Sequence, residues 1–145
     1  MLRNGRHSVA GQIYLVTFTT AGRATHFDTW ETASLVSGLL CKSSVWRDSC
    51  LLAWVLMPDH WHGLVQLGES ETLSRCIGRM KGFTARQLRL AHPSLERIWA
   101  TGYHDRALRQ EDDLRATARY LAMNPVRAGL VERVGDYPYW DAIWV

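Results

Sequence analysis

The segment His60-Trp61-His62 is the first pattern in this chain that could do chemistry. On a β-strand, residues two apart point to the same side, so both imidazoles would share one face and Trp61 would point to the other. Two neighbouring imidazoles can bind one divalent ion when a third ligand comes from elsewhere in the fold. Histidine pairs without metal also occur on sheet faces, so the spacing alone leaves both interpretations open.

Tyr120 and Asn124 form a second candidate pair, because residues four apart on a helix lie on one face. Tyr120 lies away from the apolar stripe of its segment, which consists of Leu114, Ala118, Leu121 and Ala122. A tyrosine there can simply pack its ring on the surface. Its phenol can also be a nucleophile towards phosphorus, with a nearby metal ion that polarises the phosphate. Asn124 would then supply an oxygen ligand and complete a His-His-Asn metal site.

Basic residues concentrate in one segment and in one polar strand. The segment 75–89 contains Arg75, Arg79, Lys81, Arg86 and Arg89 and no acidic residue. On a helix its four arginines form a stripe, which is typical of a solvated face, but the absence of acids favours contact with phosphates. The strand-like segment Tyr103-His104-Asp105-Arg106 is either an ordinary polar strand face or an edge that contacts phosphates or bases.

The first half of the chain predicts one strand, one helix and a hairpin. Residues 12–20 are rich in β-branched and aromatic residues, as is typical of a strand. Asp28 and Glu31 resemble a capping box for a helix that continues to about Trp46. The segments 51–57 and 60–67 are separated by Pro58-Asp59 and predict a hairpin of two strands.

The second half predicts a helix over 72–91, a strand over 98–108 that is interrupted at Gly102, and a helix from 111 to about 123. Asn124-Pro125 ends that helix, and an irregular aromatic tail follows from about residue 126. The order strand, helix, strand, strand, helix, strand, helix predicts an α+β fold, an antiparallel sheet with helices on it in a split βαβ arrangement.

Composition limits the class of protein. The chain has 145 residues, 47% of them hydrophobic and 21% charged, which fits one globular domain over 1–145. The longest strongly apolar run, Cys50 to Met57, is too short to span a bilayer, so we expect no membrane association. Three cysteines without C-x-x-C spacing predict a reducing, cytoplasmic location and no disulfide framework. A net charge of +3 weakly favours an acidic partner such as nucleic acid.

Taken together, the motifs resemble those of REP-associated tyrosine transposases, which belong to the HUH superfamily of single-strand DNA transposases. The segment Met57 to His62 resembles the HUH motif, and Tyr120 to Leu130 looks like the tyrosine signature of that family. Shorter matches occur at Gly5-Arg6, at residues 11–14, at Lys81-Gly82, at Ala85-Arg86, at residues 102–105 and at residues 134–138. One departure is Arg106, where many relatives carry histidine.

The resemblance implies a ferredoxin-like HUH-nuclease core and a metal-dependent endonuclease and strand transferase. Family members cut single-stranded DNA at hairpin-forming palindromes through a 5′-phosphotyrosine intermediate, with Mg²⁺ or Mn²⁺ as the ion. By position, Tyr120 would be the catalytic nucleophile and His60, His62 and Asn124 the metal ligands. The expected DNA-binding residues are Arg6, His7, Arg75, Arg79, Lys81, Arg86, Arg89, His104, Arg106 and Arg127.

The expected partner is hairpin-forming single-stranded DNA, bound by a monomer or a homodimer in the cytoplasm, in association with the nucleoid. Two other functions stay open. The chain could bind a nucleic-acid hairpin without cutting it, although the intact set of His60, His62, Tyr120 and Asn124 argues against this. It could also be a metal-dependent phosphodiesterase that uses water, with Tyr120 merely structural.

Overall fold

The computed structural model describes residues 8–109 and 111–144 and contains one antiparallel sheet. Its strands are β1 (Ile13–Thr19), β2 (Cys50–Met57), β3 (His60–Gln66), β4 (His104–Leu108) and β5 (Trp140–Ala142). They lie in the order β4-β1-β3-β2-β5. The first four strands therefore have the order of a split βαβ unit, and this confirms the predicted ferredoxin-like α+β fold.

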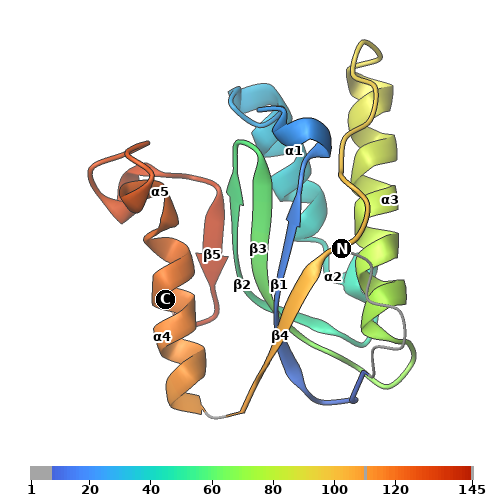
Figure 1. Cartoon of the computed structure of the whole chain (residues 1–145), viewed down its shortest axis with the longest axis vertical. Helices are drawn as coiled ribbons and strands as arrows, with labels where there is room; N and C mark the ends of the chain where they lie inside the picture. The colour runs from blue at the N-terminus through green and yellow to red at the C-terminus, as the bar shows by residue number, and fades with distance from the viewer. Residues whose placement is uncertain (1–7, 110, 145) are drawn as a thin grey trace.

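The helices cover both faces of this sheet (Figure 1). They are α1 (Trp30–Leu40), α2 (Ser43–Trp46), α3 (Leu73–Ala91), α4 (Glu111–Ala122) and α5 (Asn124–Arg127), with short 3-10 turns at Ala21–Arg23 and Val134–Asp136. One hydrophobic core joins α1 and α3 to the sheet, and a second core joins α4 to the opposite face. No helix within the described part of the chain is long and apolar enough to cross a membrane.

The alternation of side chains along β1 and β3 decides which residues meet α4. Phe18 and Trp61 are buried in the α1–α3 core and stack with their ring centroids 4.9 Å apart. Leu64 is buried in the core beneath α4. Because residues two apart on a strand share a face, His60 and His62 lie with Leu64 on the α4 side. This confirms that both imidazoles share one face of the sheet.

Gly63 allows the Trp61 ring to lie flat against β3. A Cβ atom at Gly63 would come within 2.0 Å of the Trp61 ring, so any larger residue there would displace the indole. Trp61 itself has no exposed surface. Its ring is also stacked with the Trp46 ring, and the two ring centroids are 6.2 Å apart. The strand that carries the histidine pair is thus anchored from its far side by a fully buried aromatic residue.

Two details of the first helix differ from the sequence-based prediction. Its N-cap is Thr29, whose hydroxyl oxygen accepts a hydrogen bond from the backbone N–H of Thr32, whereas Asp28 accepts one from the Thr25 hydroxyl. A threonine can satisfy the same orphan N–H as an aspartate, so the N-cap lies one residue after the predicted position, Asp28. The helix also ends at Leu40, and Trp46 belongs to the separate short helix α2.

The predicted irregular tail contains a strand. Residues 140–142 pair with β2, with Trp140 opposite Val55, and the Tyr137 hydroxyl donates to the Leu56 carbonyl. The tail therefore extends the sheet past β2 instead of only covering it. Three residues are too short for a period-two pattern to stand out, which explains why this strand is not readable from the sequence.

Candidate active site

The two histidines of β3 are held by different neighbours. Their ring centroids are 4.6 Å apart and the rings are nearly perpendicular, at 84°. The Nδ1 atom of His60 lies 2.7 Å from Asp59 Oδ1, and the Nδ1 atom of His62 lies 2.7 Å from Thr17 Oγ1. Because both Nδ1 atoms have a partner, Nε2 is the atom of each ring that remains to bind a metal ion.

Asp59 is itself fixed by a cation. Arg23 donates from Nε to Asp59 Oδ2 at 3.0 Å, and its Nη2 atom lies 2.9 Å from the same oxygen in an ion pair. Partial burial works to raise the pKa of Asp59, but hydrogen bonds from His60 and Arg23 outweigh it, and the pKa lies below the ordinary value of 3.8. The carboxylate is therefore ionised at neutral pH and can orient the His60 ring.

His62 is uncharged at neutral pH. Burial lowers its pKa from the ordinary 6.5 to about 4, and the electrostatic interactions with His60, Arg127 and Arg23 act in the same direction. A neutral imidazole is the form that binds a metal ion, so this environment favours ligation at neutral pH.

Arg127 connects the tyrosine and the asparagine. Its guanidinium carbon lies 3.6 Å from the centroid of the Tyr120 ring, and Nη2 donates to the Tyr120 carbonyl at 2.7 Å and to Asn124 Oδ1 at 3.1 Å. The same guanidinium lies near enough to His62 to lower its pKa. Arg127 thus joins Tyr120 to Asn124 across the α4–α5 junction.

Tyr120 and Asn124 sit where one helix passes into the next. Tyr120, in the last turn of α4, is 61% exposed, and Asn124 begins α5 ahead of the buried Pro125. A tyrosine whose only role is packing would hide more of its ring, whereas this phenol is open to solvent. The single helix expected over Tyr120 and Asn124 is thus two consecutive helices, and the two residues lie on either side of the junction between them.

His104 and Arg106 lie on the same face as the histidine pair. On β4, His104 is opposite Thr17 and Arg106 is opposite Leu15. Thr17 is also opposite His62 on β3, so His104, Thr17 and His62 form one row across three strands. Both β4 side chains are exposed. Their position beside the candidate site agrees with the predicted polar edge.

The basic stripe of α3 is not free of counter-charge, and the sequence-based expectation is wrong on this point. Both terminal nitrogens of Arg79 donate to the Glu71 carboxylate, whose side chain is only 4% exposed. Lys81 donates to the carbonyls of Ala100 and Gly102, at 2.6 and 2.7 Å. Arg79 and Lys81 therefore hold the fold together, and the exposed cations are the better candidates for DNA contacts.

The other predicted DNA contacts stay predictions. Arg75, Arg86 and Arg89 are exposed on α3, which packs on the sheet face opposite the histidine pair. Arg6 and His7 lie outside the described residues.

Sequence reasoning missed Thr17, Asp59 and Arg23. Asp59 could have been identified in the sequence as the neighbour of His60. Identifying Thr17 requires the register of β1 against β3, and identifying Arg23 requires knowledge of a contact between residues far apart in the sequence.

The donor set decides which metal sites are possible. Among residues 8–109 and 111–144, no cluster of three or more His, Cys, Asp or Glu side chains could hold an ion. A site built on His60 and His62 therefore needs a ligand of another type, and the Asn124 amide oxygen is of a suitable kind. Two imidazole nitrogens and one amide oxygen fit a divalent ion.

Comparison with known proteins identifies the family. A REP-associated tyrosine transposase of Escherichia coli (strain K12) is 33% identical over 90 residues, which are 60% of this chain and 50% of that protein. The chain spans about half the length of the curated relatives it matches. A solved REP-associated tyrosine transposase, bound to a REP hairpin, matches 97% of this chain and 82% of its own with a TM-score of 0.75 and 25% identity. Residues 8–124 match the family model described as Transposase IS200 like, so the chain belongs to the IS200-like transposase family.

Proposed function

We propose that this chain binds a DNA hairpin and cuts the single strand beside it, with Tyr120 as the nucleophile. The observation that carries the proposal is the position of Arg127, which contacts Tyr120 and Asn124 and lies near enough to His62 to act on its pKa. The solved relative bound to a REP hairpin supports the choice of DNA.

In this proposal His60 and His62 offer their Nε2 atoms, and Asn124 its amide oxygen, to Mg²⁺ or Mn²⁺. The ion would supply a Lewis acid that polarises the scissile phosphate. Asp59 and Thr17 fix the orientation of the two imidazoles from behind, at 2.7 Å each. Arg127 donates to Asn124 Oδ1 in this structure, and the second lone pair of that amide oxygen would serve the ion.

The proposed reaction exchanges one phosphodiester for another. The phenolic oxygen of Tyr120 loses its proton and forms an ester bond to phosphorus. The bond between phosphorus and the 3′ oxygen breaks, and that oxygen takes up a proton. The products are a 5′-phosphotyrosine and a free 3′-hydroxyl. The energy of the broken ester is kept in the new one, so the reaction needs no ATP and the strand can be rejoined.

The proposed DNA surface combines the cations that remain exposed. His104 and Arg106 lie beside the histidine pair, Arg127 lies at the tyrosine, and Arg75, Arg86 and Arg89 lie on α3. Each phosphate contact that is lost should lower the slope of log K against log salt by about one or slightly less. We further propose that residues 1–145 act as one domain, as a monomer or homodimer, in the cytoplasm and in association with the nucleoid.

Cleavage assays with histidine variants test this function. The substrate is a hairpin oligonucleotide with an unpaired flank, incubated with Mn²⁺ or with a chelator and analysed on a denaturing gel. Wild-type protein should cut only with Mn²⁺, and His60→Ala should abolish cutting, whereas His92→Ala, at the end of α3, should leave it unchanged. Cutting in the chelator would overturn the metal site. Tight hairpin binding without any cutting would favour the binding protein instead.

A further inference from the structure

The turn that follows β1, residues 20–24, holds Asp59 at both its main chain and its side chain. The Thr20 N–H donates to the Asp59 carbonyl at 2.9 Å. The Thr20 hydroxyl lies 3.1 Å from the same carbonyl and 2.7 Å from the Ala24 carbonyl. At the other end of the turn, Arg23 Nε donates to Asp59 Oδ2 at 3.0 Å. We call residues 20–24 the β1 turn, and it fixes the residue that directly precedes His60.

The β1 turn is itself anchored to the segment that precedes β4. Thr20 is 1% exposed and forms an isolated β-bridge with Trp99. The N–H of Ala21 donates to the Ile98 carbonyl at 2.9 Å. A buried polar network whose members have partners is rigid. The turn is therefore a firm support, and the support acts on Asp59.

Arg23 has a backbone conformation that residues with a Cβ atom rarely adopt. Its φ is 57°, in the left-handed region, and Gly22 before it has a φ of 63°. Gly22 takes this conformation at little cost, whereas Arg23 loses free energy there. Strained residues of this kind occur where the surrounding structure imposes them, and they cluster at functional sites. In this turn the strained residue is the one whose guanidinium binds Asp59.

The contacts of Asp59 determine which nitrogen of His60 is free. An ionised carboxylate only accepts hydrogen bonds, so His60 Nδ1, 2.7 Å from Asp59 Oδ1, carries the proton and Nε2 carries the lone pair. Arg23 binds the other carboxylate oxygen, Oδ2. Because a carboxylate is a rigid planar group, a contact that fixes Oδ2 also fixes the position of Oδ1.

We propose that Arg23 is a positioning residue of the metal site, which acts through Asp59 to hold the His60 imidazole in its Nδ1–H tautomer with Nε2 free for the ion. The proposal rests on the proposed function, because it takes the divalent ion from there. It gives the β1 turn a role in a site whose ligands come from β3 and from the α4–α5 junction.

The charge of Arg23 alone would have the opposite effect. Its side chain is a cation, 60% exposed, and a cation close to a metal site repels the ion. If charge were all that mattered, removing it would tighten metal binding. Removing a group that orients a metal ligand weakens binding instead, typically by about 10- to 100-fold. Arg23 acts through one further residue, so we expect the lower end, about tenfold.

NMR of the metal-free protein tests the positioning without any ion. The histidine rings are labelled with ¹⁵N, and spectra are recorded at about pH 8, above the ordinary histidine pKa of about 6.5. Wild-type His60 should be the Nδ1–H tautomer, and Arg23→Gln should shift it towards the Nε2–H tautomer. His92, at the end of α3, is the internal reference and should keep its signals. An unchanged His60 tautomer in Arg23→Gln would overturn the proposal.

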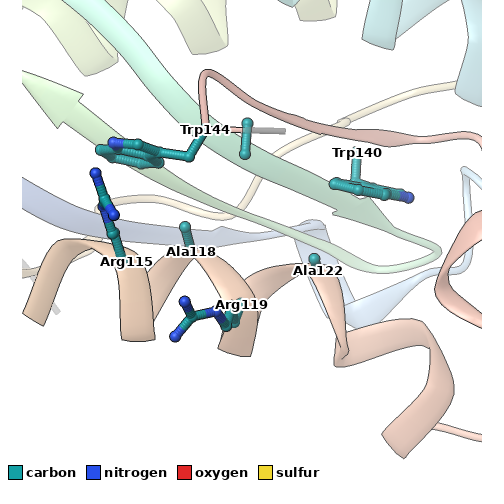
Figure 2. A pocket seen from close by; sticks show the side chains of 7 residues that line it. Arg115, Ala118, Arg119, Ala122, Trp140 and Trp144 are labelled. Atoms are coloured by element: carbon teal, nitrogen blue, oxygen red, sulfur yellow. The ribbon is translucent and has the colours of Figure 1, made fainter. Parts of the chain in front are cut away.

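Titration calorimetry with Mn²⁺ alone supplies the second test. Arg23→Gln should raise the Mn²⁺ dissociation constant about tenfold, with a melting temperature close to wild type because the ion pair is largely exposed. Arg119→Gln is the matched control and should bind Mn²⁺ like wild type. Arg119 is an exposed arginine on α4, where it lines a cavity of about 270 Å³ together with Trp140 and Trp144 (Figure 2).

A double-mutant cycle shows whether Arg23 acts through Asp59. Asp59→Asn should weaken Mn²⁺ binding by itself, and adding Arg23→Gln to it should cause little further loss, because the two residues belong to one chain of contacts. The same loss in both backgrounds would overturn the proposed route. Tighter Mn²⁺ binding by Arg23→Gln would leave only the charge effect and would also overturn it.

The positioning role and the proposed function fail separately. If Arg23→Gln weakens hairpin binding but keeps the wild-type Mn²⁺ affinity and His60 tautomer, Arg23 is a phosphate contact, the positioning role is wrong and the proposed function is untouched. If the wild-type protein binds no Mn²⁺, the proposed metal site is wrong. The tautomer of His60 in the metal-free protein then still decides whether Arg23 orients the ring.

Discussion

Replacing Arg79 by alanine should damage the fold and not the DNA surface. The Glu71 side chain is 4% exposed and receives both terminal nitrogens of Arg79, while Arg79 Nε donates to the Val45 carbonyl at 3.0 Å. The variant leaves a buried carboxylate whose other cation, Arg47, is 3.9 Å away and mostly exposed. The hydrogen bond with Glu71 also raises the pKa of Arg79, as expected for a structural pair.

The size of the effect follows from the burial of the carboxylate. Removing one partner of a buried ion pair costs roughly 3–5 kcal/mol. Arg47 offsets part of this cost and Arg79 is partly exposed, so we expect the lower end, about 3 kcal/mol, in the free energy of unfolding. For a chain of this length that corresponds to a melting temperature lower by about 10 °C.

Urea denaturation followed by tryptophan fluorescence measures this loss, with Arg75→Ala on the same helix as the matched control. Arg75 is exposed, so its replacement should change the free energy of unfolding by less than about 0.5 kcal/mol. The double variant Glu71→Gln, Arg79→Met removes the buried charge and should recover much of the stability. If Arg79→Ala is as stable as Arg75→Ala but binds hairpins more weakly, Arg79 is a phosphate contact and this reasoning is refuted.

Three further predictions concern pH, the arginine at the tyrosine and the thiols. Burial lowers the pKa of His62 from 6.5 to about 4, so on acidification the unfolded chain binds a proton at this residue at a higher pH than the folded chain does. The free energy of unfolding should therefore fall by about 3 kcal/mol as pH drops from 6.5 to 4. His62→Asn should flatten that profile in urea titrations, and an unchanged profile would contradict it. Arg127→Ala should slow single-turnover cleavage by about tenfold or more, the scale of a lost oriented contact, while a wild-type rate would exclude this role. Burial raises the pKa of the Cys76 thiol to about 11, so iodoacetamide should modify exposed Cys50 first, and equal rates by mass spectrometry would count against the buried environment.

Local patterns predicted the parts of the site that lie on one element. His60 and His62 share a face because alternation along a strand is a property of the backbone. Tyr120 and Asn124 are four apart in the sequence but lie on two helices, α4 and α5, and Arg127 contacts both. The histidine geometry depends on a few consecutive residues, so the sequence alone indicates it, whereas the contact of Tyr120 and Asn124 with Arg127 is visible only in the structure.

The contacts between elements could not be read in this way. Thr17 reaches His62 through the register of β1 against β3, over a separation of 45 residues. Glu71 lies just before α3 and outside the basic segment 75–89. Its carboxylate nevertheless binds Arg79, about two helical turns further along the chain. Strand β5 forms only because β2 offers it an edge. Each of these depends on which elements the fold brings together.

The single measurement that tests the account most directly is covalent capture by Tyr120. Wild-type protein, incubated with Mn²⁺ and a labelled hairpin with an unpaired flank, should form an adduct that survives denaturing electrophoresis and carries the fragment with the 5′ phosphate. Tyr120→Phe should form no adduct, with hairpin affinity and melting temperature close to wild type because Tyr120 is 61% exposed and keeps its ring. Tyr139→Phe is the matched control and should form the adduct normally. A Tyr120→Phe variant that still cuts near the wild-type rate would contradict the phosphotyrosine mechanism.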